Sequence, residues 1–173
     1  SRRKGVFRMV EALHRVEPET ARKAEFRFLG KAAVRDRVAF ANALLRLRRR
    51  RPDVRVSFDD RAVPEQELRE AMADADWILM PYLRPEYSSG ILARAVAAGT
   101  PALGPAEGLI GRLILESGLG RVTRMDPVSL GRSLDEAAAA PGRIEESRRA
   151  TFLDRSRPDV FAKSLLRAGW LDG

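Results

Sequence analysis

The chain has 173 residues, 45% of them hydrophobic and 32% charged, so it can bury a core, and we expect one domain over residues 1–173. Because it has no cysteine and a single histidine, His14, disulfides are excluded and a metal site built on thiolates or histidines lacks its ligands. No apolar run reaches the roughly 20 residues that span a bilayer, and the first ten residues lack the apolar core of a signal peptide. We therefore expect a cytoplasmic protein without a metal or other cofactor.

The charge balance favours anionic partners. Thirty-two Lys and Arg residues against 24 Asp and Glu give a net charge of +8. Phosphates and acidic membranes both fit this balance. Nucleic acid fits poorly, because only 6% of residues are aromatic and no RNA-binding signature or zinc-finger spacing occurs.

The first third of the chain predicts helix, strand and helix. "GVFRMVEALHRV" places apolar residues at helical spacing, and "AEFRFLG" reads as a short buried strand ending at a glycine. The next helix stops before Pro52 and has two sets of apolar positions. These are Val34, Val38, Ala41 and Leu45 on one face, with Phe40, Leu44 and Leu47 beside them.

The alternation then continues. "DVRVSF", "DWILMPY", "PALG" and "RVTRM" predict strands, and helical segments separate them. Asp126 and Pro127 form a helix start, and two further amphipathic helices are expected over about 142–170, broken at Pro158. The pattern predicts an α/β fold, a Rossmann-like three-layer α/β/α sandwich around a mostly parallel sheet.

In such sheets ligands bind beyond the carboxyl ends of the strands, so the loops after Phe28, Phe58, Met80 and Leu103 are the candidate site. After the third strand, "RPEYSSG" places Ser88, Ser89 and Gly90 at a helix start. Hydroxyls and free backbone N–H groups there suit a phosphate, although an ordinary serine N-cap has the same pattern.

The order and gaps of several segments resemble a known family. They are "RKGVFRMVEAL", "FRFLG", "VRVSFDDRAVPEQELREAMADADWILMPY", "PEYSSGILARAVAAGTPALG" and "GLIGRLILESGLG". Over residues 3–140 the chain resembles the C-terminal, donor-binding half of GT-B retaining glycosyltransferases of family 4. The resemblance implies transfer of a sugar from a nucleotide-sugar donor to an acceptor such as a cell-surface polysaccharide or glycolipid. It also implies an N-terminal acceptor-binding domain outside this chain.

The resemblance assigns roles residue by residue. It implies that Glu86, the first glutamate of the family's E-x7-E motif, is the catalytic residue that contacts the donor sugar near the reacting carbon. Ser88, Ser89 and Gly90 match the loop that meets the donor diphosphate, and Lys4 matches the cation that neutralises it. Gly30 and the Asp59–Arg61 turn would border the base, which makes Arg61 a donor-binding candidate.

Arg94 stands where the family has its second glutamate, so the charge there is reversed. Its long side chain can bind a phosphate bidentately or pair with an acid. Without the resemblance, Glu86 reads as a surface carboxylate and Lys4 as part of a solvated basic start.

The basic run Arg46–Arg51 ends a helix, where cations complement the helix dipole. The alternative is peripheral association with anionic lipid at the inner membrane face. As alternatives to a transferase we consider a non-catalytic nucleotide-binding or scaffold module with a degenerate donor site, and a receiver-like signalling domain. A receiver would need acids after its first strand, whereas Asp59 and Asp60 follow a middle strand.

Overall fold

The computed structural model describes residues 4–83 and 90–156, in which helices and parallel strands alternate as the sequence predicts. The predicted α/β class is confirmed. In chain order the elements are α1 Val6–Leu13, α2 Pro18–Lys23, β1 Phe26–Leu29, α3 Val34–Arg50, β2 Val56–Asp59, α4 Glu65–Asp74, β3 Ile78–Leu79, α5 Gly90–Ala97, β4 Ala102–Pro105, α6 Gly108–Glu116, β5 Gly120–Thr123, α7 Pro127–Ala139 and α8 Glu146–Arg155.

Local chemistry explains how several helices begin. The carboxylate of Asp126 accepts hydrogen bonds from the backbone N–H groups of Val128 (3.1 Å) and Ser129 (2.9 Å), and Pro127 occupies the first turn. These bonds, the one from Ser129 foremost, lower the pKa of Asp126. The cap predicted from sequence is therefore confirmed. The short helix α2 was not predicted, because its six residues are too few to show a period.

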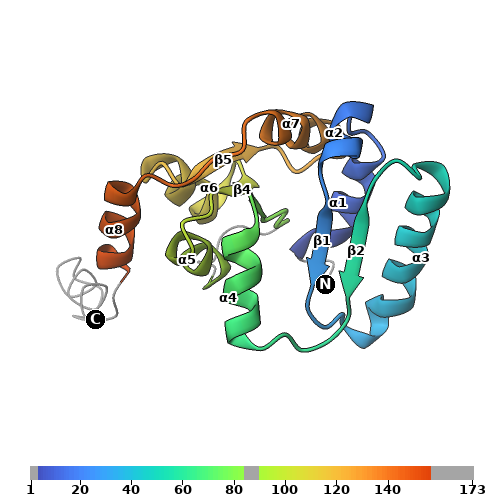
Figure 1. Ribbon diagram of the computed structural model, residues 1–173, viewed down its shortest axis with the longest axis horizontal. Helices are drawn as coiled ribbons and strands as arrows, with labels where there is room; N and C mark the ends of the chain where they lie inside the picture. Colours follow the sequence, from blue (N-terminus) through green and yellow to red (C-terminus); the bar gives the residue numbers. More distant parts are fainter. Residues whose placement is uncertain (1–3, 84–89, 157–173) are drawn as a thin grey trace, which may run out of the picture.

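The strands are parallel, but they form two sheets rather than one: β1 with β2, and β3 with β4 and β5 (Figure 1). Within the described residues, β1 and β3 each pair on one side only. The backbone N–H groups of Phe26 and Gly30 donate to carbonyl oxygens directly before β2 and in β2. The N–H of Leu29, which lies between them, therefore points away from β2. The N–H groups of Ile78 and Met80 donate toward β4 in the same way, which turns Leu79 outward.

The core lies on both faces of the strands. Leu79 and Leu103 join a cluster with α1, α3 and α7, whereas the adjacent residues Met80 and Ala102 join a second cluster with α5, α6 and α8. Side chains of a strand alternate between its faces, so this division is what a three-layer fold requires. The three layers are therefore present although the sheet is divided.

Helix α1 links the two sheets. It packs against α3, which covers β1 and β2, and against α7, which follows β5. Leu13 of α1 is fully buried, in the same cluster as Phe26 of β1 and Leu103 of β4. Apolar packing therefore joins the two sheets where ladder hydrogen bonds do not.

Helix α3 buries one of its two apolar sets. Phe40 packs edge-to-face against Phe7, Phe28 and Phe58, with ring centroids 5.0–5.6 Å apart. Leu44 and Leu47 lie beside it in the core. The other apolar set faces outward, with Val34 82%, Val38 71% and Leu45 45% exposed.

We predict that the open edges exchange backbone protons faster than the paired ones. In the 173-residue chain, the amides of Leu29 and Leu79 should exchange faster than those of Gly30 and Met80, which donate to Asp59 and Leu103. Hydrogen–deuterium exchange followed by NMR measures this directly. Equal protection of both sets would mean that a further strand or another partner covers these edges.

Candidate functional site

The loops after β1 and β2 are held together by hydrogen bonds. Gly30 has a left-handed φ of 116°, and its N–H donates to the carbonyl oxygen of Asp59 over 3.1 Å. Two residues on, the N–H of Ala32 donates to the carboxylate of Asp60 over 2.8 Å. That carboxylate also pairs with Arg37 of α3, at 2.7 Å. Gly30 is thereby fixed at the carboxyl end of the first sheet.

Arg61 pairs with two acids. Its Nε lies 2.9 Å from the carboxylate of Asp59, and its guanidinium group also forms an ion pair with Glu67 in the first turn of α4. The hydrogen bond from Arg61 lowers the pKa of Glu67. Arg61 therefore ties the end of β2 to the start of α4.

Arg94 pairs with Glu65, the first residue of α4, through Nε at 2.9 Å. The hydrogen bond from Arg94 is the largest cause of the lowered pKa of Glu65. The guanidinium group also lies over the helix start, since a Cβ added at Gly90 would be 3.0 Å from Nη1 of Arg94. The predicted pairing of Arg94 with an acid is present, and Glu65 is that acid.

Four predicted site residues thus lie along one line of contacts at the carboxyl ends of the strands. The line runs from the loop after β1, through the acids of β2 and α4, to the start of α5. Its members are Gly30, Asp59, Arg61, Glu67, Glu65, Arg94 and Gly90. Within this line two arginines are paired with three acids, so an incoming anion must compete with those acids for the arginines.

Lys4 lies at the same edge, because its neighbour Gly5 packs against Pro81, two residues after the end of β3. Gly5 is buried with a left-handed φ of 68°, and an added Cβ would be 1.7 Å from the carbonyl oxygen of Pro81. Only glycine permits this approach. Lys4 itself is exposed. Glu86, Ser88 and Ser89 lie outside the described residues.

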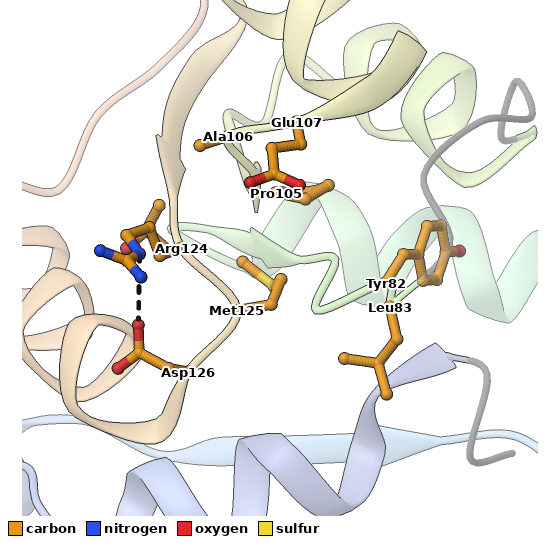
Figure 2. A pocket seen from close by; sticks show the side chains of 9 residues that line it. Tyr82, Leu83, Pro105, Ala106, Glu107, Arg124, Met125 and Asp126 are labelled. Atoms are coloured by element: carbon orange, nitrogen blue, oxygen red, sulfur yellow. Dashed lines mark ion pairs between the residues drawn. The ribbon is translucent and has the colours of Figure 1, made fainter.

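A hollow of about 240 Å³ opens beyond the ends of β3, β4 and β5 (Figure 2). Its lining includes Tyr82, Leu83, Glu107, Arg124 and Met125, and the carboxylate of Glu107 projects into it from the start of α6. Tyr82, Leu83 and Glu107 lie in the loops after Met80 and Leu103, which the sequence predicts as part of the site, whereas Arg124 and Met125 lie in a loop that was not predicted. Applying the carboxyl-end rule to the strand "RVTRM" as well would have drawn attention to the loop that contains Arg124.

The basic run Arg46–Arg51 does not act as one unit. Arg51 points inward and donates to the carbonyl oxygens of His14 (2.9 Å) and Val16 (3.0 Å), while also pairing with Asp53. Burial, and then the charges of nearby arginines, lower the pKa of His14. Arg51 is therefore a structural residue that ties α3 to the end of α1.

No group of three or more His, Cys, Asp or Glu side chains in residues 4–83 and 90–156 is placed to hold a metal ion. Within the same residues, no helix has the length and apolar character to cross a membrane.

Solved structures of several other proteins match this fold. HepE from Anabaena, in complex with UDP and glucose, matches with a TM-score of 0.68 and 18% identity over 99% of this chain and 46% of HepE. WaaG, a glycosyltransferase involved in lipopolysaccharide biosynthesis, matches with a TM-score of 0.61 and 24% identity over 91% of this chain and 39% of WaaG. AviGT4, a glycosyltransferase involved in avilamycin A biosynthesis, matches with a TM-score of 0.64 and 17% identity, over 98% of this chain and 50% of its own.

The sequence matches no protein-family model and no curated protein. This chain spans about half the length of the structures that it resembles, or less. At these identities, the comparisons establish a fold shared with structures that include glycosyltransferases.

We predict that Gly5→Ala destabilises the protein, because the new methyl group meets the Pro81 carbonyl and the left-handed backbone is strained. The free energy of unfolding should fall by about 1–3 kcal/mol in urea denaturation. Gly142→Ala is the matched control, since its Cβ would make only an ordinary 3.9 Å contact with Pro101. Equal stabilities for both variants would contradict the close contact between Gly5, just before α1, and the carbonyl group of Pro81.

Proposed function

We propose that this chain binds the nucleotide-sugar donor of a glycosyltransferase. Two observations support the proposal. The fold likeness covers nearly the whole chain and includes a structure that holds UDP and glucose. The predicted donor-binding residues Gly30, Arg61, Gly90 and Arg94 lie along one line of contacts at the ligand-binding edge of the fold.

In the proposed reaction, the bond between the sugar's anomeric carbon and the diphosphate oxygen breaks. An acceptor hydroxyl forms the new bond to that carbon and passes its proton to the leaving diphosphate. Negative charge grows on the leaving diphosphate. Lys4 and the backbone N–H groups at the start of α5 would stabilise that charge in fixed positions. Glu86 would orient the sugar, and Ser88 and Ser89 would donate hydrogen bonds to the diphosphate.

Arg94 has a conditional role in this proposal. It reaches the start of α5, where the diphosphate would lie, but Glu65 already holds its guanidinium group. Both side chains are about half exposed, so their pairing contributes little to stability and can exchange for a ligand. A donor diphosphate would then replace Glu65 as the partner of Arg94.

Turnover would require an acceptor-binding domain beyond these 173 residues, since the structures that the chain resembles are about twice as long or longer. We expect the chain alone to bind donor weakly and to transfer sugar slowly or not at all. The proposed acceptor is a cell-surface polysaccharide or glycolipid, and the proposed site of action is the cytoplasm.

One observation favours a second candidate, a nucleotide-binding or scaffold module without catalysis. Arg61 and Arg94 are both ion-paired with acids, so the edge has less free positive charge than a strong diphosphate site needs. The two candidates differ in whether a nucleotide diphosphate can draw Arg94 away from Glu65.

Titration calorimetry with UDP distinguishes a donor site from a scaffold module that binds no nucleotide. We predict weak binding to the 173-residue chain, about fivefold tighter binding to Glu65→Gln, which releases Arg94, and about tenfold weaker binding to Arg94→Gln. Glu70→Gln on the same helix is the control and should bind like wild type. If no variant binds UDP or UDP-glucose at millimolar concentration, the donor site is wrong; equal binding by all four proteins would remove Arg94 from it.

A further inference from the structure

The outward face of α3 combines an apolar stripe with rows of arginine. Val34, Val38, Ala41 and Leu45 are all exposed, and at 3.6 residues per turn they fall on one line along the helix. The inward face is already filled by Phe40, Ala43, Leu44 and Leu47, which pack in the core. The outward stripe is therefore a second apolar face that the described fold does not cover.

Arginines border this stripe on both sides. By helical geometry Arg37 and Arg48 follow one side, and Arg35, Arg46 and Arg49 follow the other, all of them exposed. The only acid on α3, Asp36, is buried on the inward side at 4% exposure. The helix thus presents apolar and cationic groups to solvent, and no carboxylate of its own.

Some of these arginines have partners within the protein. Arg37 pairs with Asp60 at 2.7 Å, and Arg48 donates to the carbonyl oxygen of Val56 at 2.9 Å. Within the part of the chain that the structure describes, no ion pair is formed by Arg35, Arg46 or Arg49. The row on the Arg46 side therefore has its charge available for a partner.

We propose that the outer face of α3 docks on an anionic lipid surface. A bilayer presents phosphates directly above an apolar layer, so it meets an apolar stripe and its bordering cations at the same time. Val34, Val38 and Leu45 enter the boundary between headgroups and acyl chains, and Arg35, Arg46 and Arg49 contact lipid phosphates. Arg51, which points inward, takes no part.

The docked orientation brings the proposed donor edge close to the membrane. Val34 begins α3 four residues after Gly30, so the N-terminal end of the docked helix lies next to the loop after β1. Docking itself depends only on α3 and not on the proposed sugar transfer. The docking proposal can therefore be tested separately from UDP binding.

Co-sedimentation with vesicles of phosphatidylcholine and phosphatidylglycerol tests the proposal, with pure phosphatidylcholine as the reference. We expect binding only to the anionic vesicles, and weaker binding at high salt. Neutralising Arg46 and Arg49 together to Gln should weaken binding about 25-fold, roughly fivefold for each cation. Val34→Ser with Val38→Ser should weaken it severalfold without changing the net charge.

The matched control lies on α6. Arg112→Gln with Leu115→Ser removes one exposed cation and one exposed apolar side chain, Leu115 being 58% exposed, and should retain wild-type binding within about twofold after correction for bulk charge. Circular dichroism checks that each variant is folded. No binding to anionic vesicles, or loss of binding in the arginine variant but not in the valine variant, would overturn the docking of this face.

Discussion

The fold depends on the packing of α1 against both sheets. Within the described residues β1 and β3 do not pair, so hydrogen bonds hold each sheet together but do not join the two. The apolar cluster around Leu13 supplies that connection, with residues of β1, β4, α3 and α7. Gly5 adds a close backbone approach to Pro81 and so fixes where α1 begins. The relative position of the two sheets therefore rests on burial of apolar surface.

The geometry of the candidate site depends on this apolar packing, because the site extends across both sheets. Gly30 and Arg61 belong to the loops of the first sheet, whereas Gly90 and Arg94 belong to the helix after β3 in the second. Helix α4 bridges them, with Glu67 paired to Arg61 and Glu65 paired to Arg94. These exposed pairs are individually weak, so the apolar core positions the two halves and the ion pairs only adjust them. An exchange of ion-pair partners along this edge would leave the core undisturbed.

The sequence predicted the elements that depend on local chemistry and missed features that depend on distant contacts. Asp and Pro are favoured at the N-cap and the first helical position, and Asp126 and Pro127 occupy these positions at the start of α7. The two apolar sets of α3 were visible, but periodicity alone does not decide which set is buried; the aromatic cluster around Phe40 does. Likewise, the sequence suggested an acid as a partner for Arg94 but not which acid, because Glu65 lies 29 residues away. Division of the sheet depends on pairing between strands, which no local pattern records.

The proposed nucleotide diphosphate site lies at the carboxyl ends of these strands, across the junction of the two sheets. The most direct measurement is an NMR titration of the isotopically labelled chain with UDP. We predict shifts of the backbone amide signals of Gly30 and Gly90, one from each half of the edge, and no shift for Gly120 at the opposite end of β5. Shifts centred on Gly120, or no response of Gly30 and Gly90 at saturating UDP, would contradict it.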